Sequence, residues 1–449
     1  MSSEILNPVD WYRAQFTAFE KALNGDAGGR AGELRRSGID RFIAVGFPTT
    51  RDEEWRFTNT AALARMHFGL APRERAREVP EAVISPHVLP GRTSARIVLV
   101  NGHVDQKLSS LTGLPRGVTV EPLAAALRRK DPVTSAHLAA LADIQLNPFT
   151  ALQTAFLFDG VVVHVREGVE LADPLHIILY ATNEAEPQAI HPRILVVAEK
   201  RSRCSLVETY AGAAEAHYLT NAVSEIVVGD DATLTHDILQ VESPGAYHVG
   251  SRYIAQGRGS TLTSNSLNFG GGWVRNTVYA KFTGEGAECT LNGLSLATGE
   301  QLIDNHTTID HAVPRCASHE LYKAILDGKA RGVFNGKIYV RPDAQKTDAR
   351  QTNKTLLLSD EATIDTKPQL EIFADDVKCT HGATVGQLDE EQLFYLRARG
   401  IDLQAARDLL TFAFAGDVIS RIHESGLRDS LDSLLHTRLQ QGHIMTTPL

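Results

Sequence analysis

The order of hydrophobic and polar residues divides the chain into three parts. Up to residue 157, hydrophobic residues such as Trp11 and Phe16 mostly follow the spacing of amphipathic helices. Between residues 158 and 388, short runs such as GVVVHV and LHIILYAT are bounded by Gly, Asp and Asn, which indicates β-strands. The helical spacing then returns. We therefore expect a mostly helical N-terminal region (1–157), a β core (158–388) and a C-terminal helical region (389–449).

Individual helices can be placed within the two outer parts. In the N-terminal region we expect helices at 8–25, 49–66, 121–130, 134–144 and 147–157. We also expect one short extended segment at 95–102. In the C-terminal region we expect helices at 390–400, 402–423 and 425–442. Asp389 is suited to cap the first of these three helices, and Gly400 to end it.

The β core contains a repeat. The segments EKRSRCS, GDDATLT, GRGSTLT and GEGAECT begin at Glu199, Gly229, Gly257 and Gly284, at spacings of 30, 28 and 27 residues. SDEATID at Ser359 has the same form: a polar turn, a small residue and an inward apolar residue. A period of this length predicts a solenoid in which each repeat forms one coil. A β-helix fits better than a β-sandwich, because a sandwich would not explain the near-constant spacing.

Composition and charge restrict the partners and the location of the chain. It has 449 residues, a net charge of −9 and an isoelectric point of about 6.0, which argues against nucleic acid or an anionic membrane as a partner. No apolar run approaches the roughly 20 residues of a membrane span, and the N-terminus lacks the features of a signal peptide. We therefore expect a cytoplasmic protein whose four scattered cysteines stay reduced.

The segment DDVKCTHGATVG contains the most suggestive chemical group. Cys379 and His381 are two residues apart, so in a strand they face the same side, and Asp375 shares their parity. Asp376 lies beside them. Two protein ligands cannot complete a structural metal site, so a metal or cluster here would need ligands from elsewhere. The alternative is a half-buried thiol beside a surface histidine.

Other histidines and cysteines are better explained as structural residues. His306 and His311 are five residues apart, so they would face opposite sides of one strand. Cys204 and Cys289 occupy the inward position of the repeat, where a core thiol is expected. No recognised catalytic motif occurs, so the residues alone favour a non-catalytic scaffold over an enzyme.

Two segments resemble a known family. The run from DNHTTIDHAVPRCASHELYK through FADDVKCTHGATVGQLDEEQLFYLRARGI (residues 304–401) and the segment GFPTTRDEEWRFTNT (46–60) are similar to the SufD branch of the SufB/SufD family. This family belongs to the SUF machinery for iron–sulfur cluster assembly. The resemblance covers the C-terminal third almost continuously and the rest more weakly.

The resemblance implies a fold and a set of partners. The fold is a right-handed parallel β-helix flanked by helical segments. The partners are SufB, bound through the two β-helices, and the SufC ATPase, bound through the C-terminal helices at about 389–440. A transient iron–sulfur cluster forms at the SufB–SufD interface with sulfur from a desulfurase system, and SufB supplies the main cysteine. ATPase activity belongs to SufC, so this chain is a scaffold subunit.

The resemblance also ranks the site residues. SufB carries Gln-Cys where this chain has Gln351 and Thr352, and His-Glu where this chain has His381 and Gly382. Both departures indicate the SufD branch, in which the histidine equivalent to His381 is tied to cluster formation. Cys379 is the weaker ligand candidate. An iron-bound imidazole needs a partner for its other nitrogen, a role suited to Asp375 or Asp376.

Three further points stay open at this stage. The chain could be a purely structural adaptor with no ligand role, or a polysaccharide-active β-helix enzyme, although the missing signal peptide and the 6% aromatic content oppose the enzyme. SufD-type chains can also pair with themselves when isolated. The sequence carries no information on whether a flavin is held by the assembled complex.

Overall fold

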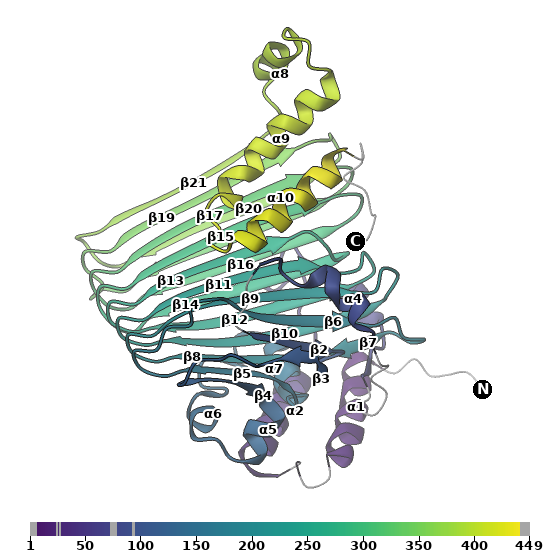
Figure 1. Cartoon of the computed structure of the whole chain (residues 1–449), viewed down its shortest axis with the longest axis vertical. Coiled ribbons are helices and arrows are strands. Elements are labelled where there is room, and N and C mark those ends of the chain that lie inside the picture. Colours follow the sequence, from purple (N-terminus) through teal and green to yellow (C-terminus); the bar gives the residue numbers. More distant parts are fainter. Residues whose placement is uncertain (1–6, 24–25, 27, 72–78, 92–94, 441–449) are drawn as a thin grey trace.

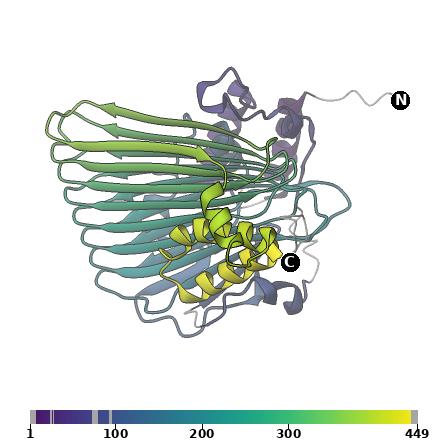
Figure 2. The same ribbon diagram turned by 90° about the horizontal axis from the view of Figure 1, so that it is seen from above.

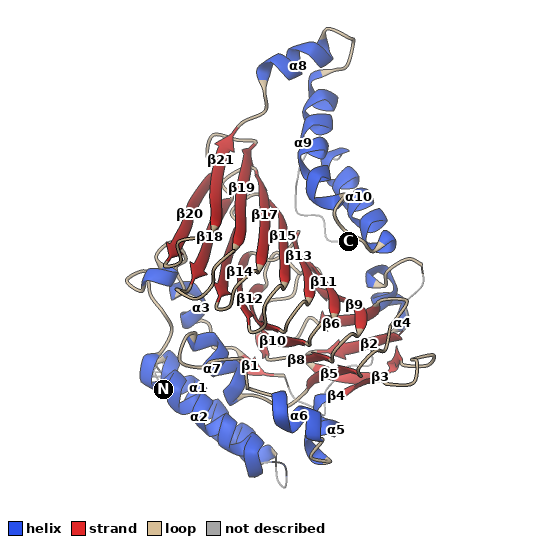
Figure 3. Cartoon of the chain, turned by 90° about the vertical axis from the view of Figure 1, so that its left-hand side faces the viewer, coloured by secondary structure: helices blue, strands red, loops and turns tan. Residues whose placement is uncertain are grey.

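The centre of the molecule is a β-helix of about eight turns with helical segments on either side (Figure 1). The computed structural model describes residues 7–23, 26, 28–71, 79–91 and 95–440. Two largely parallel sheets, here called sheet A and sheet B, form the walls of the β-helix (Figure 3). The predicted β-helix with flanking helices is therefore confirmed. Within the described residues, no helix is both long and apolar enough to span a bilayer.

The chain alternates between the two sheets as it winds. The main path of sheet A consists of β4 (Val118–Pro122), β5 (Gly160–Val165), β8 (Arg193–Ala198), β10 (Tyr218–Val228), β12 (Tyr247–Gln256), β14 (Trp273–Phe282), β16 (Leu302–His311), β18 (Arg331–Val340) and β20 (Thr363–Ile372), with β1 (Gly69–Leu70) and β7 (Gln188–Ile190) attached beside it. Sheet B consists of β3 (His103–Ser110), β2 (Ala95–Val100), β6 (Leu175–Ala181), β9 (Arg203–Gly212), β11 (Thr233–Val241), β13 (Thr261–Asn268), β15 (Glu288–Ala297), β17 (Ala317–Leu326), β19 (Asp348–Leu357) and β21 (Lys378–Gly386). Neighbouring strands are parallel except for the β2–β3 and β4–β5 pairs.

The sequence repeat corresponds to one corner of the coil. The four predicted turns all lie where the chain passes from sheet A to sheet B. Each turn has one residue in the left-handed conformation, followed by a small buried side chain; the pairs are Arg201 and Ser202, Asp231 and Ala232, Gly259 and Ser260, and Gly286 and Ala287. The small residue is needed because it points into the narrow corner of the core. The match at Ser359 does not belong to this series, because it lies at the opposite corner, between β19 and β20.

Alternate residues of each strand point into the β-helix. Along sheet B, the register places Cys204, Leu234, Leu262 and Cys289 in one inward column. All four are buried in the main hydrophobic core, so both cysteines are core thiols as predicted.

The N-terminal region contains helices as well as strands. Its helical segments are α1 (Pro8–Ala22), α2 (Gly29–Val45), η2 (Glu53–Trp55), α3 (Ala61–Arg65), α4 (Glu81–Ile84), η4 (Ser85–His87), α5 (Leu123–Arg128), α6 (Pro132–His137) and α7 (Pro148–Ala155). Helices α1, α5 and α7 and strand β2 lie where the sequence places them. Strands β3 and β4, which extend sheets B and A, were not predicted.

Two helix predictions are wrong in part and one helix was not predicted, each for a physical reason. The segment 49–66 forms only η2 and α3, because Asp52 instead accepts a hydrogen bond from the backbone N–H of Thr49 at 2.7 Å and closes a turn. Helix α6 ends at His137, because the backbone N–H groups that follow turn toward Glu225. Helix α2 was missed because of its glycines. One of these, Gly38, lets α2 pack directly on the backbone of α7, where an added Cβ would meet Ala155 N at 2.6 Å.

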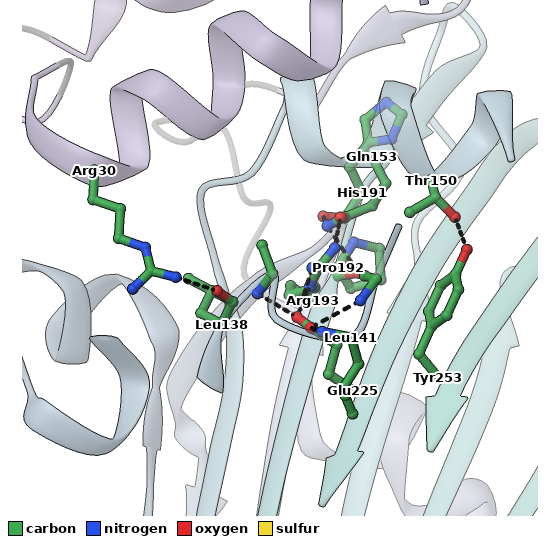
Figure 4. A network of polar contacts seen from close by, with 12 residues as sticks. Arg30, Leu138, Leu141, Thr150, Gln153, His191, Pro192, Arg193, Glu225 and Tyr253 are labelled. Atoms are coloured by element: carbon green, nitrogen blue, oxygen red, sulfur yellow. Dashed lines mark hydrogen bonds and ion pairs between the residues drawn. The ribbon is translucent and has the colours of Figure 1, made fainter. Parts of the chain in front are cut away.

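A buried ion pair fastens the N-terminal region to the outer face of sheet A (Figure 4). Arg193 on β8 and Glu225 on β10 are both fully buried, with 2.6 Å between Nη2 and Oε1. Glu225 also accepts backbone hydrogen bonds from Ala139, Leu141 and Ala142 at 2.7, 2.8 and 3.1 Å. One carboxylate therefore holds both its counter-ion and the loop that precedes α7.

The C-terminal region forms α8 (Glu390–Arg397), α9 (Leu403–Ile419) and α10 (Ser425–Gln440), as predicted. Asp389 caps α8 by accepting hydrogen bonds from two backbone N–H groups, and Gly400 has a φ of +88°. Helices α9 and α10 cover part of the outer face of sheet B (Figures 2 and 3), where Leu427 and Leu431 share a buried cluster with Leu294.

Candidate functional site

The Cys-x-His pair lies on the last coil of the β-helix. Strands β20 and β21 are the end strands of sheets A and B, so each has one edge that pairs with no other strand of the described chain (Figure 3). Cys379 and His381 are both on β21, where the register aligns them with Ala349 and Gln351 of β19. Ala349 and Gln351 are buried inward residues, so the pair faces the interior at the open end of the β-helix.

Cys379 lies in an apolar environment. It is half-buried and packs against a cluster that includes Ile338 and Val340. Burial raises the pKa of the Cys379 thiol, and the nearby Asp348 carboxylate adds to the rise. The thiolate is the form that binds metals, so this environment makes Cys379 a poorer ligand than an accessible cysteine.

His381 is exposed, in contrast to the residues that precede it in the same column. Gln351 on β19 and Glu320 on β17 occupy the equivalent positions of the two preceding coils, and both are buried. The Nε2 of Gln351 donates a hydrogen bond of 2.6 Å to Oε2 of Glu320. Burial raises the pKa of Glu320 to about 7. His381 is exposed because, in the part of the chain that the structure describes, no further coil follows β21 to cover it.

Asp375 and Asp376 do not share the strand face with this pair. Strand β21 begins at Lys378, so both carboxylates lie in the turn before it, and the expectation that Asp375 continues the inward face is wrong. Asp376 forms an ion pair with Lys346, and its backbone N–H donates to Oε1 of Gln345 at 2.9 Å. Asp376 is thereby tied to the turn of the preceding coil, which leaves it poorly placed to orient His381.

The other two histidines considered in the sequence, His306 and His311, contact residues of the fold rather than each other. His306 faces outward and contacts Asp304 and Glu54 at 3.0 and 3.4 Å. His311 faces inward and lies 2.9 Å from the Ser318 hydroxyl, so the two histidines face opposite sides of β16 as predicted. Within the described residues, His, Cys, Asp and Glu form no group of three or more that could hold a metal ion.

The Glu320–Gln351 pair is the feature of the site that the sequence interpretation missed. The sequence interpretation uses Gln351 only as the residue before Thr352, the position that differs between the branches of the family. The repeat could have revealed the pair, because continuing the coil period from β17 through β19 to β21 places Glu320, Gln351 and His381 in one column.

Exposed hydrophobic residues lie at two places near the C-terminal end. The first is the last coil, where Phe373 follows β20 at one corner and Val385 lies near the far end of β21; they are 57% and 44% exposed and do not form one patch. The second is on α8 and the start of α9 and includes Phe394 and Tyr395, which are 74% and 55% exposed. Contiguous exposed apolar surface commonly marks an interaction site.

Comparison with known proteins assigns both halves of the chain. Residues 8–177 match a family model described as the SufBD protein N-terminal region, and residues 180–414 match the SUF system FeS cluster assembly, SufBD core domain. An iron–sulfur cluster assembly SufBD family protein of Synechocystis is 32% identical over 90% of each chain. The iron–sulfur cluster assembly protein SufD of Escherichia coli is 31% identical over 90% of this chain and 92% of its own. The chloroplastic protein ABCI7 of Arabidopsis thaliana is 30% identical over 88% and 83%.

Proposed function

The chain belongs to the SufBD family of SUF-system iron–sulfur cluster assembly components, and from this premise we propose that it is a non-catalytic scaffold subunit of a SufB–SufC–SufD complex. It pairs with SufB through the β-helix, binds the SufC ATPase through its C-terminal helices, and lends His381 to the nascent cluster. The observation that carries the proposal is the position of His381 on the inward face of an open last coil.

The end of the β-helix supports pairing with another β-helix. The free edges of β20 and β21 present backbone N–H and C=O groups, and unpaired edges of this kind are templates for a further strand. The exposed Phe373 and Val385 add apolar surface at the same end. A SufB β-helix docked here would continue both sheets across the interface.

The donor set supports a shared cluster. An iron–sulfur cluster is commonly held by four protein ligands, whereas the last coil offers His381 and the poorly suited Cys379. The cluster is cargo that must leave the complex, and a site divided between two chains can open when they separate. The remaining ligands are therefore assigned to SufB.

The second exposed surface suits the ATPase partner. Phe394 and Tyr395 on α8, with Leu403 and Leu409 on α9, are all at least 47% exposed. Lys323 of β17 forms an ion pair of 2.9 Å with Asp417 of α9 and donates to the Phe414 carbonyl. A movement of these helices on SufC would therefore be transmitted to sheet B, which contains β21.

Anaerobic reconstitution of the complex tests this function. The chain should first co-purify with SufB and SufC. Iron and sulfide per complex are then counted for the wild type, for His381→Ala and for His319→Ala, a control that removes an exposed histidine from β17, which is separated from β21 by β19 in the same sheet. We expect His381→Ala to lower both counts several-fold while the control matches the wild type. Wild-type counts in His381→Ala would instead support an adaptor with no ligand role.

A further inference from the structure

Two buried polar side chains precede His381 in its inward column. The register aligns Leu291, Glu320, Gln351 and His381 on β15, β17, β19 and β21. Leu291 lies in the hydrophobic core, whereas Glu320 and Gln351 are polar and only 3% and 2% exposed. A buried polar group is costly unless it is hydrogen-bonded, so the bonding of these two side chains decides what they do.

Gln351 has one bonded end and one free end. Its Nε2 donates to Glu320, but its Oε1 is buried and has no hydrogen-bond partner among the described residues. Because Nε2 of Gln351 is hydrogen-bonded to Glu320 on β17, Oε1 is the polar atom left to face β21, the neighbour of β19 on the opposite side. The next inward residue on that side is His381, on the adjacent strand.

The opposite sheet leaves space for this amide. Gly336 on β18 has no side chain, and a Cβ built there would overlap the Nε2 of Gln351 and lie 2.7 Å from its Cδ. The φ of Gly336 is not in the left-handed region, so its backbone does not require glycine. The glycine therefore accommodates the end of the Gln351 side chain.

We propose that Gln351 is a positioning residue for His381, with its Oε1 accepting a hydrogen bond from one ring N–H of the imidazole. The bond fixes the tautomer and turns the other ring nitrogen, with its lone pair, toward iron at the open end of the β-helix. Histidine ligands generally need such a partner for their second nitrogen. The Glu320 carboxyl holds the amide in the required orientation. This inference rests on the proposed function, which supplies the metal.

The hydrogen bond is tested on the isolated chain, without cluster. Ring ¹⁵N chemical shifts of labelled histidine, assigned to His381 by their loss in His381→Ala, report the tautomer. We expect a single tautomer in the wild type and an averaged mixture in Gln351→Met. Gly336→Ala keeps the glutamine but displaces its amide, and should also shift the His381 signals. Gln256→Met is the control, because Gln256 is another buried inward glutamine, on distant β12. Unchanged His381 shifts in Gln351→Met would overturn the proposal.

Cluster assembly in the complex separates the two claims. Loss of the residue that orients a metal-binding histidine typically costs about 10–100-fold in metal affinity, so we expect Gln351→Met to lower cluster yield at limiting iron about tenfold, with Gln256→Met unchanged. A loss in His381→Ala with no loss in Gln351→Met would overturn the positioning role and leave the proposed function standing. Wild-type yield in His381→Ala would instead refute the proposed function, while the ¹⁵N shifts still decide the hydrogen bond.

Discussion

Replacing Glu225 by glutamine should loosen the attachment of the N-terminal region to the β-helix. The carboxylate accepts two hydrogen bonds from the Arg193 guanidinium and three from backbone N–H groups of residues 139–142. Whichever way the new amide is turned, its NH2 group faces donors where an oxygen had accepted. The guanidinium also remains buried without its counter-charge.

The structure sets the size of the effect. Both partners are fully buried, and removing one member of a buried ion pair costs about 3–5 kcal/mol. With an m value of about 3 kcal/mol/M in urea, this loss lowers the unfolding midpoint by roughly 1–1.7 M. The matched control is Glu285→Gln. Glu285 pairs with Arg315 at 3.1 Å, but both side chains are more than half exposed, so the expected cost is below about 1 kcal/mol.

The assay is urea unfolding of the isolated chain, combined with hydrogen exchange at residues 139–142. The local measurement is needed because the coils of a solenoid can unfold separately, and a single midpoint can then hide a local change. We expect faster exchange at these amides in Glu225→Gln and no change in Glu285→Gln. Equal midpoints and equal exchange in the two variants would refute the argument that this carboxylate holds the loop.

Three further predictions concern Glu320, Cys379 and Asp304. Burial raises the folded-state pKa of Glu320 from its usual 4.5 to about 7, so the stability contributed by its protonated form is lost as pH rises through that interval. The free energy of unfolding of Glu320→Gln, relative to wild type, should therefore increase by about 3 kcal/mol between pH 4.5 and 8. Urea unfolding at several pH values measures this difference, and a difference that does not change with pH would contradict the prediction. Iodoacetamide should label Cys379 before the other three cysteines, which are buried. The reaction should be slower than that of a free thiol because the pKa of Cys379 is raised. Equal labelling of all four cysteines in mass spectrometry would contradict the partial exposure of Cys379. Asp304→Asn should destabilise the fold by about 3–5 kcal/mol and expose residues 46–60 to protease. The reason is that the buried Asp304 carboxylate lies 2.5 Å from Nη1 of Arg275, whose guanidinium stacks on the Trp55 ring. Protease resistance equal to that of the wild type would argue against this prediction.

The parts of the fold that the sequence predicts are those set by local pattern. The coil repeat is visible because each corner needs a left-handed residue and a small buried one, and both requirements restrict residue type. Helix α2 and strands β3 and β4 were not predicted because they are stabilised by packing against elements distant in the sequence. Gly38, for example, lowers the helix propensity of α2 but allows its close contact with α7. At the site, strand parity placed Cys379 and His381 together. It misplaced Asp375 because the start of β21 is set by pairing with β19.

The two ends of the β-helix differ in a way that favours the C-terminal end for the proposed site. At the N-terminal end, β3 and β4 add antiparallel strands to the two sheets, and Leu111 and Leu114, in the segment between these strands, pack against the main core. At the C-terminal end, β20 and β21 each have an edge that no strand of the described residues pairs with, and the helices that follow cover the outer face of sheet B. Glu320 and Gln351, the inward residues that precede His381 in its column, are buried because another coil follows each of them. His381 on the last coil is exposed and is preceded by this buried polar pair, which is the arrangement that the proposed shared site requires.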